Sequence, residues 1–553
     1  MDISDLPQTW DVIVIGGGIT GAGILREATR AGLRAVLLEQ KDFAWGTSSR
    51  SSKLVHGGLR YLKEGHFLMT KTAVEERERL LKEAPGLVES LGFLLPIYED
   101  QRPGKRALKV GLSLYDIMAR ERQHQYYDAA AFSRIVPHIN RRGLTGGFRF
   151  FDAQVDDCRL VLRLINEAVL AGASALNYTV VNRIIRKDGD VAGVEVQDVE
   201  TGQARTLDGR SVINATGCWA EKLHPSPEPQ RHLRPLRGSH LVFSAAALPL
   251  TEGLSFVHPR DGRPVFVIPW EGAVLVGTTD IDHSQDLSIE PNITAAEASY
   301  LMEGLQAVFP SLGLSLKACL STFAGVRPVL SEGKLKPSEE SREHVVWVDR
   351  GLVTVTGGKL TTFRRLALDA LKAVRPWLPP DTVIDRKAPV FEEVPDRPTE
   401  DFGLPLRIWR RLYGRYGLAA ETIAGKARPK DLAVIPGTHT LWAELPYVAA
   451  HEHIRHLGDL LLRRVRIGLL TPQGATGYLK RVRKLCKNAL PWSRQRWKEE
   501  IRLYRMQWRH AHALPGRRAA ISAGRKIFSV EALAAAGRSV YRKMWFAGKR
   551  DNH

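Results

Sequence analysis

Cysteine is scarce in this chain of 553 residues. Its four cysteines, at positions 158, 218, 319 and 486, are scattered, and no two of them form a Cys-X-X-Cys pair. A disulfide framework, a zinc cluster and an iron–sulfur site are therefore not expected, and a reducing compartment fits best. We expect no metal centre in this protein.

Long apolar runs are also missing. A spanning helix needs about 18 or more apolar residues in a row, and no such stretch occurs. The first ten residues, MDISDLPQTW, lack the charged-then-apolar pattern of an export signal. Neither export nor membrane spanning is expected. With 44% hydrophobic and 25% charged residues, the composition is that of an ordinary globular protein, and the length predicts about two to four domains.

Acidic residues are few in the last part of the chain. Residues 1–400 hold 49 Lys and Arg against 50 Asp and Glu, whereas residues 401–553 hold 31 against 10, so the net charge of +20 belongs to the C-terminal segment. Such a segment is suited to an anionic surface, either phospholipid headgroups or nucleic acid. A solvated helical face is the alternative. No nucleic-acid-binding motif occurs, and we expect no nucleic acid as partner.

The strongest local signal lies near the N-terminus. Residues 11–15 read as a buried parallel strand and residues 16–21 as a tight turn. Residues 22–31 then read as a helix and residues 35–39 as a second strand. Together these segments predict a βαβ unit.

Three glycines and one acid give this unit the pattern of a dinucleotide site. Gly16, Gly18 and Gly21 form GxGxxG, in which side chains would block the approach of a pyrophosphate to the amides at the helix N-terminus. Glu39 ends the second strand, where a carboxylate can accept hydrogen bonds from ribose hydroxyls. The glycine motif alone is weak evidence, but strand, helix, second strand and acid together predict a bound dinucleotide.

The segments that follow favour FAD over a nicotinamide cofactor. Residues 46–61, GTSSRSSKLVHGGLRY, offer many short donors that can wrap the phosphates and ring system of a large cofactor; a flexible serine-rich loop is the alternative. Residues 174–217 read as a β-meander that ends in Asn-Ala-Thr-Gly, which is typical of flavin-binding two-dinucleotide proteins. The residues expected to contact FAD are Gly16, Gly18, Gly21, Glu39, Thr47, Ser48, Ser49, Ser52, Lys53, Leu54, His56, Gly57, Gly58, Ala215, Thr216, Gly217, Gly358, Lys359 and Thr361.

Six further motifs complete a family pattern. They are VDD (155–157), RGSH (237–240), IPW (268–270), GTTD (277–280), GVRP (325–328) and GGKLTT (357–362). With residues 16–61 they resemble FAD-dependent glycerol-3-phosphate dehydrogenase, and the resemblance runs to about residue 510. It implies a flavoprotein that oxidises sn-glycerol 3-phosphate to dihydroxyacetone phosphate and passes electrons to a membrane quinone. It also implies a cytoplasmic protein, peripheral on the inner face of the cell membrane.

The resemblance implies a phosphate site lined by cations. Arg327, Arg342 and Lys359 match positions that bind substrate in this family, with Arg60 and Tyr61 beside them. Arginine supplies bidentate donors and lysine a point charge. Each cation could instead form a structural salt bridge, and Tyr61 could be core packing.

Hydride transfer from C2 requires an acceptor for the proton of the C2 hydroxyl. His240 and His56 are the candidates, and Arg327 and Lys359 are the other expected catalytic residues. Water is a further candidate, and the sequence leaves the base open.

Other function classes stay open at this point. A glycerol-3-phosphate oxidase would use the same motifs but deliver electrons to oxygen. A related FAD amine or amino-acid oxidoreductase would bind a single carboxylate, whereas the clustered cations favour a phosphate. A basic nucleic-acid-binding protein with a relict nucleotide fold is the least enzymatic alternative.

The expected fold is α/β. It combines a glutathione-reductase-like two-dinucleotide fold for FAD, an antiparallel-sheet substrate domain and an all-α C-terminal domain. Residues 1–390 are expected to form the oxidoreductase unit. Its FAD subdomain would comprise about 1–75, 150–225 and 320–375, and its substrate subdomain the remainder.

The C-terminal domain is expected at residues 391–553, with its basic surface on an anionic membrane. Within the tail, residues 527–549 carry apolar side chains at near-helical spacing, which predicts an interfacial amphipathic helix; a helix docked on its own protein is the alternative. A homodimer is an assembly that the sequence leaves open.

Overall fold

The computed structural model describes residues 2–517, except 60–61, 63–64, 121–122, 225–231, 332, 334–339 and 341–343. Arg60, Tyr61 and Arg342 lie outside the described residues. So does the helix predicted at residues 527–549.

The first sheet forms the nucleotide-binding layer. Its strands run in the order β17, β18, β10, β1, β2, β7, with a β8–β9 hairpin joined to β10. The strands are β1 Thr9–Ile15, β2 Ala35–Leu38, β7 Ser174–Leu176, β8 Thr179–Lys187, β9 Asp190–Asp198, β10 Ala204–Asn214, β17 His344–Asp349 and β18 Leu352–Gly357. From β18 to β7 the pairing is parallel. Strands in such a sheet are buried on both faces, which explains the nearly continuous apolar run of β1.

Three helices pack together beside this sheet. They are α1 Ile19–Arg30, α6 Asp157–Leu170 and α9 Phe363–Ala373, and α1 contacts both of the others. A Cβ on Gly23 would lie 2.8 Å from the Phe363 ring, so α1 and α9 approach each other as closely as a glycine allows. Residues of β1, α1, α6 and α9 share one hydrophobic core. This packing holds α1 in position and therefore sets the direction of its N-terminal amides.

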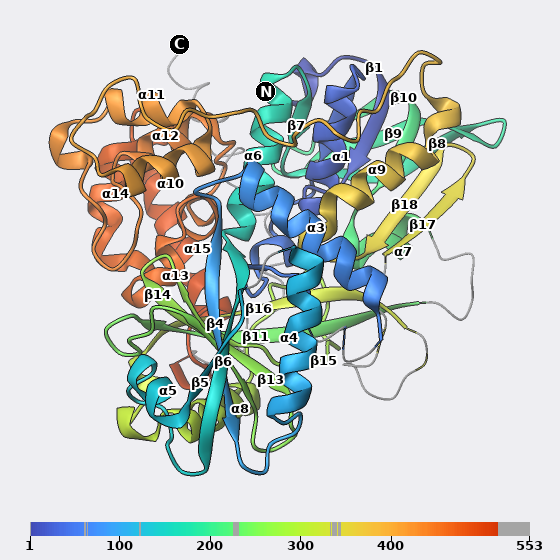
Figure 1. Cartoon of the computed structure of the whole chain (residues 1–553). Coiled ribbons are helices and arrows are strands. Elements are labelled where there is room, and N and C mark those ends of the chain that lie inside the picture. The colour runs from blue at the N-terminus through green and yellow to red at the C-terminus, as the bar shows by residue number, and fades with distance from the viewer. Residues whose placement is uncertain are drawn as a thin grey trace.

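The second sheet lies below the first in Figure 1. Its order is β15, β11, β14, β13, β12, β4, β6, β3, with β16 added at β11 and β5 at β6. The strands are β3 Leu54–Val55, β4 Val88–Tyr98, β5 Gln125–Asp128, β6 Leu144–Val155, β11 Leu233–Ser244, β12 Gly253–Val257, β13 Pro264–Trp270, β14 Ala273–Gly277, β15 Ile281–Asp282 and β16 Cys319–Leu330. Its pairs are antiparallel except for β12 with β4. Residues 319–330 and 150–155, expected in the FAD subdomain, pair within this sheet.

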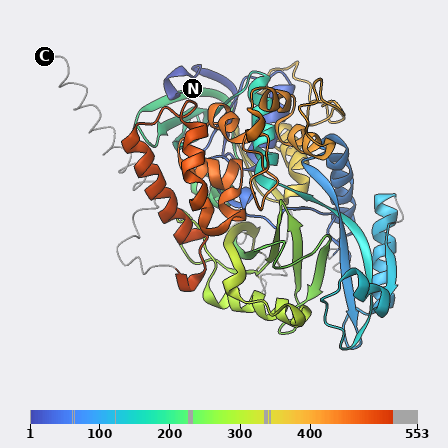
Figure 2. The same cartoon turned by 90° about the vertical axis from the view of Figure 1, so that its left-hand side faces the viewer.

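Four helices accompany the second sheet and one short helix follows β10. They are α3 Phe67–Glu83, α4 Lys105–Ala119, α5 Ala129–Ile135 and α8 Ala295–Val308, and α7 Ala220–Leu223. Helix α4 stands at the front of the view in Figure 1 and at one edge of the molecule in Figure 2.

Helices build the last part of the described chain, which we call the C-terminal domain. They are α10 Leu406–Tyr416, α11 Ala419–Gly425, α12 Glu444–His451, α13 Ile467–Leu470, α14 Leu479–Cys486 and α15 Arg494–Ala511. They enclose a hydrophobic core of their own, and residues 378–405 lead to them without helix or strand. The predicted fold class is thus confirmed. Among the described residues, no helix combines the length and apolar character needed to cross a membrane.

Candidate functional site

A cavity of about 1140 Å³ is lined by residues of both sheets. Its volume exceeds that of a usual small-molecule pocket and suits a dinucleotide together with a small substrate. Sixteen of the predicted site residues line it: Gly16, Gly18, Glu39, Thr47, Ser48, Ser52, Leu54, His56, Gly58, Ala215, Thr216, Gly217, Arg327, Gly358, Lys359 and Thr361. The structure therefore brings together segments that lie more than 300 residues apart.

Two positions of the glycine turn leave no room for a side chain. Gly16 has a φ of +109°, and a Cβ there would lie 2.6 Å from the carbonyl oxygen of Ala215. A Cβ on Gly21 would overlap the carbonyl oxygen of Gly16. The turn thus holds the N-terminus of α1 against the cavity, where helix amides favour an anion.

Side chains hold both ends of this turn. The Ile19 amide donates to the Ser48 hydroxyl at 2.9 Å, which ties the serine-rich segment to the start of α1. The Glu39 carboxylate accepts from the amides of Gly17 at 2.7 Å and Lys41 at 2.8 Å. Burial raises the pKa of Glu39, and these two donors oppose the rise. Each carboxylate oxygen has a further lone pair, which can accept a ribose hydroxyl.

Lys53, by contrast, lies behind the cavity wall. Its side chain is fully buried, and its ammonium donates to the Asp157 carboxylate and to the Ser49 carbonyl, both at 2.7 Å. Burial lowers the pKa of Lys53 to about 8, against the opposing charge of Asp157. Asp157 also accepts from the Ser51 amide and hydroxyl. Lys53 and Ser49 therefore support the serine-rich segment, whereas the cofactor contacts predicted for them remain predictions.

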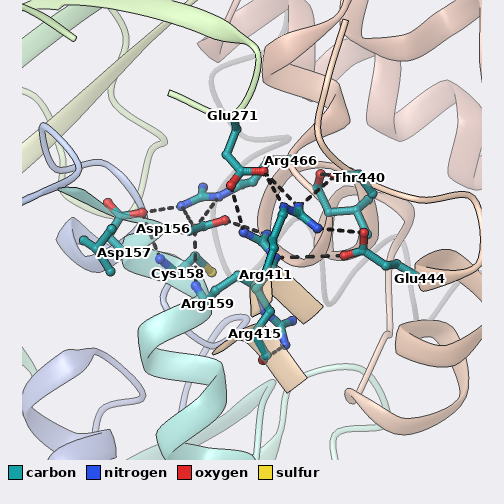
Figure 3. Close-up of polar contacts among 12 residues, drawn as sticks. Asp156, Asp157, Cys158, Arg159, Glu271, Arg411, Arg415, Thr440, Glu444 and Arg466 are labelled. Carbon is teal, nitrogen blue, oxygen red and sulfur yellow. Dashed lines mark hydrogen bonds and ion pairs between the residues drawn. The ribbon is translucent and has the colours of Figure 1, made fainter. Parts of the chain in front are cut away.

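Arginines of the C-terminal domain pair with Asp157 and with two other acids nearby. Figure 3 shows Arg466, Arg415 and Arg411 pointing toward Asp156 and Asp157 at the start of α6 and toward Glu271 between β13 and β14. Arg415 lies 2.8 Å from Asp156, Arg411 lies 2.8 Å from Glu271, and Arg466 pairs with Asp157. These three guanidinium groups are buried. Buried acids of the preceding domain thus neutralise part of the positive charge of the C-terminal domain.

A second ion-pair cluster anchors the end of β2. Asp42 is fully buried, three residues beyond Glu39, and pairs with Arg463 and Arg464. Against the effect of burial, the two guanidinium groups lower the pKa of Asp42 to about 2. The C-terminal domain therefore holds the loop next to the predicted ribose carboxylate.

Arg327, Lys359 and His56 face one cavity from three segments. Arg327 extends from β16 and is held by Asp280 at 2.8 Å. Lys359 precedes α9, and its charge acts on His56. Burial lowers the pKa of His56, and the Lys359 charge adds to this effect against the opposing carboxylate of Asp152. The His56 ring is consequently neutral near pH 7 and able to accept a proton.

His240 does not line the cavity. Its Nε2 lies 2.9 Å from the Ser52 hydroxyl, and its ring stacks on Phe323 with centroids 4.5 Å apart. Burial lowers the pKa of His240 well below its usual value, and the charges of Lys53 and Arg327 lower it further. Of the two predicted bases, His56 lines the cavity and His240 contacts it through Ser52.

The sequence missed two features of the cavity. One is Asp280, which fixes Arg327 and stands in the GTTD motif without having been assigned a role. The other is an apolar wall from β4, β6, β12 and β13, formed by Phe93, Leu95, Phe150, Phe256 and Phe266. No sequence signal separates these side chains from ordinary core residues of alternating strands.

Comparison with known proteins identifies the family. The profile described as FAD dependent oxidoreductase matches residues 11–364, and the C-terminal domain of alpha-glycerophosphate oxidase matches residues 389–497. An aerobic glycerol-3-phosphate dehydrogenase from Staphylococcus haemolyticus is 33% identical over 486 residues, which cover 83% of this chain and 86% of the relative. The chain belongs to the family of aerobic glycerol-3-phosphate dehydrogenases. A relative of the same name from Bacillus subtilis is 36% identical over 374 residues, 66% of this chain and 67% of its own.

Solved structures agree with this family. A glycerol-3-phosphate dehydrogenase from Bacillus halodurans, complexed with FAD, superposes with a TM-score of 0.72 at 26% identity, over 91% of this chain and 95% of that one. An FAD-bound L-alpha-glycerophosphate oxidase from Mycoplasma pneumoniae shares the fold, with a TM-score of 0.58 at 20% identity over 70% of this chain and 100% of its own. The predicted cofactor, FAD, is confirmed, and the glycine turn, Glu39 and the serine-rich segment fit it.

Gly21→Val in this dehydrogenase family member is expected to weaken FAD binding at least tenfold. The new side chain would push α1 away from the Gly16 carbonyl and displace the amides that receive the pyrophosphate. Calorimetric titration of the apoprotein with FAD measures the change. Gly111→Val is the matched control, because a Cβ at this other helical glycine meets nothing within 4 Å. Equal FAD affinity of the Gly21 variant and the wild type would contradict the role of the turn.

Proposed function

We propose that this chain oxidises sn-glycerol 3-phosphate to dihydroxyacetone phosphate and that the electrons pass from FAD to a membrane quinone. The observation that carries the substrate is the convergence of Arg327, Lys359 and His56 on one cavity, beside the glycine turn that fits FAD. FAD, when bound, supplies the hydride acceptor. The membership of the chain in the aerobic glycerol-3-phosphate dehydrogenases supports this substrate.

In this proposal the cations bind the substrate phosphate. Arg327 offers a planar fork of donors, and its ion pair with Asp280 fixes the direction of that fork. Lys359 contributes a point charge from another segment that lines the cavity. Arg60, Tyr61 and Arg342 remain predicted substrate residues outside the described part of the chain.

His56 is the proposed proton acceptor. Its ring is neutral near pH 7, so it can take the proton of the C2 hydroxyl as the hydride leaves C2. The positive charge of Lys359 nearby stabilises the negative charge that develops on the substrate oxygen. His240 is proposed to act on the cavity through Ser52.

The deciding experiment is anaerobic addition of sn-glycerol 3-phosphate to the FAD-loaded protein while the flavin absorption is followed. We expect bleaching by this substrate and not by L-amino acids or sarcosine, and reoxidation by a quinone faster than by oxygen. Fast reoxidation by oxygen with stoichiometric peroxide would indicate the oxidase instead. Bleaching by an amine would keep the fold and replace the substrate.

Arg327→Met is expected to lower kcat/KM for sn-glycerol 3-phosphate by about 10- to 100-fold. The change removes charge-assisted hydrogen bonds worth about 1.5–3 kcal/mol. Steady-state kinetics with a soluble acceptor measures it. Arg260→Gln is the control, since Arg260 is an exposed arginine in an ion pair with Glu303. Unchanged kcat/KM in the Arg327 variant would remove this residue from the phosphate site.

The anionic membrane surface is a further part of the proposal. The C-terminal domain retains many exposed basic side chains, and those on or next to α14 and α15 are Lys480, Arg483, Lys484, Lys487, Arg494, Lys498, Arg502, Arg505 and Arg509. Such side chains are attracted to acidic phospholipids. This supports a peripheral position on the inner face of the cell membrane. The homodimer stays a prediction that light scattering can test.

A further inference from the structure

Helix α4 exposes an apolar stripe to solvent. Val110, Leu114 and Ile117 are 62%, 38% and 71% exposed, and their spacing of four and three residues puts them on one face. The opposite face of α4, with Leu112 and Tyr115, is buried in the protein core. An exposed face that is as apolar as the buried one indicates a partner that takes it out of water.

Helix α3 exposes two further large apolar side chains. It packs against α4, and Phe67 and Leu68 at its start are 51% and 82% exposed. We call the five side chains Phe67, Leu68, Val110, Leu114 and Ile117 the insertion face. They account for much of the large apolar surface exposed in the described part of the chain.

The charges beside the apolar stripe of α4 are mainly positive. Exposed basic side chains flank this stripe, and they are Arg102, Lys105, Arg106, Lys109 and Arg120. The exposed acids nearby are Glu99 and Asp100, which precede α4, and Glu75 of α3, which lies 4.0 Å from Lys71. The acid of α4, Asp116, is buried and lies 2.6 Å from His124. Apolar side chains surrounded by lysine and arginine are typical of a helix that lies in the interface of an anionic bilayer.

The segment beside the insertion face also borders the cavity. Arg102, Pro103 and Leu108, just before and within α4, line the cavity wall. Leu108 packs against the hydrophobic cluster that contains Phe93 and Phe150. A lipid-soluble molecule that leaves the bilayer at α4 would therefore meet an apolar wall as it enters the cavity.

We infer that the insertion face enters the headgroup region of an anionic bilayer and that a lipid-soluble electron acceptor reaches the cavity beside α4. The inference rests on the proposed function, because the acceptor is the quinone proposed above. It places the membrane contact on α3 and α4 and thereby replaces the contact through α14 and α15 proposed above. Figure 2 shows α4 at one edge of the molecule and α15 near the opposite edge. Substitutions on these two helices therefore test two different surfaces.

Vesicle co-sedimentation of the FAD-loaded full chain tests the membrane contact. The vesicles are equal mixtures of phosphatidylcholine and phosphatidylglycerol, and pure phosphatidylcholine is the uncharged reference. We expect Val110→Glu with Ile117→Glu to lower the partition coefficient on the order of tenfold or more, because two carboxylates must enter the interface. The matched control is Leu170→Glu with Val383→Glu, which changes two apolar residues elsewhere that are more exposed, at 86% and 74%. We expect this control to bind as the wild type does.

A label separates insertion from simple electrostatic binding. The four native cysteines are buried, so an environment-sensitive fluorophore on Ile117→Cys reports position 117 alone. We expect a blue shift with mixed vesicles, and none from the same label on Leu170→Cys. No shift at position 117, or full vesicle binding by the Val110/Ile117 double variant, would overturn the inference. So would loss of all vesicle binding in Lys498→Gln with Arg505→Gln on α15 while the label at 117 stays in water.

Electron transfer distinguishes failure of this inference from failure of the proposed function. We expect the Val110/Ile117 double variant to keep its rate with a water-soluble acceptor and to lose at least tenfold with quinone held in vesicles. Equal rates with both acceptors would overturn the entry path. Absence of flavin bleaching by sn-glycerol 3-phosphate in the wild type would instead reject the proposed function, while the sedimentation and label results would still decide the membrane contact.

Discussion

Replacing His56 with glutamine is expected to lower kcat for sn-glycerol 3-phosphate by about two to four orders of magnitude. A positioned general base contributes about 10²–10⁴ to a rate, and glutamine keeps the size of the side chain but cannot take a proton at neutral pH. Stopped-flow reduction of the flavin measures the chemical step directly. FAD content and the flavin spectrum should match those of the wild type.

The pH profile gives the same residue a second test. In the wild type, kcat/KM should fall on acidification as His56 becomes protonated, with a midpoint below the ordinary histidine value of 6.5, because burial lowers its pKa. The glutamine variant should lose this limb. His138→Gln, at a partly buried histidine that contacts Ser311 and does not line the cavity, is the control. A loss smaller than tenfold in His56→Gln, with the acid limb intact, would assign the proton to water or to the Ser52–His240 pair.

Asp42→Asn is expected to destabilise the folded chain by about 3–5 kcal/mol. The change leaves Arg464 buried without its carboxylate partner and leaves Arg463 with Asp459 alone, and an uncompensated buried charge costs about this much. The midpoint of urea unfolding, followed by tryptophan fluorescence, measures the loss. The matched control is Arg410→Gln, which breaks an exposed pair with Glu89 between the same two parts of the chain and should cost at most about 1 kcal/mol.

The acid dependence of stability has a fixed sign at this site. The pKa of Asp42 is about 2 in the folded chain, below its ordinary value of 3.8. Its ion pairs therefore contribute fully above about pH 4 and are lost as the pH falls toward 2. The asparagine variant should lack this part of the acid transition. Equal stability of the two proteins at neutral pH would show that the cluster is not needed to hold the C-terminal domain.

The nucleotide-binding unit could be predicted because its signals are local. The strand expected at 11–15 is observed as β1 Thr9–Ile15, and the helix expected at 22–31 is α1 Ile19–Arg30, which begins earlier because Gly18 is its N-terminal cap. Backbone conformation forces glycine at position 16, and close contact forces it at position 21, so spacing alone reveals them. The family motifs then placed Arg327 and Lys359 on one cavity wall.

Contacts between distant segments could not be read from the sequence. A count of lysine and arginine indicates a basic C-terminal domain, but it does not separate Arg466, which is buried against Asp157, from Lys498, which is exposed. The sequence also could not show whether His240 faces the cavity. Strand β11 is buried along most of its length, so its residues do not alternate between polar and apolar. The sequence also could not show that the apolar stripe of α4 is exposed, because exposed and buried apolar faces of a helix have the same residue spacing.

The ion pairs of Asp42 also set an order of events during synthesis. Asp42 leaves the ribosome 421 residues before Arg463 and 422 before Arg464. At about 5–20 residues per second, that interval lasts roughly 20 to 80 s. Throughout it, the nascent nucleotide-binding layer carries an acid whose final neighbours do not yet exist. The loop that carries Asp42 can form its ion pairs only after nearly the whole chain has been made. The first 400 residues alone would therefore fold poorly. A stalled ribosome or a truncated chain would leave this layer incomplete.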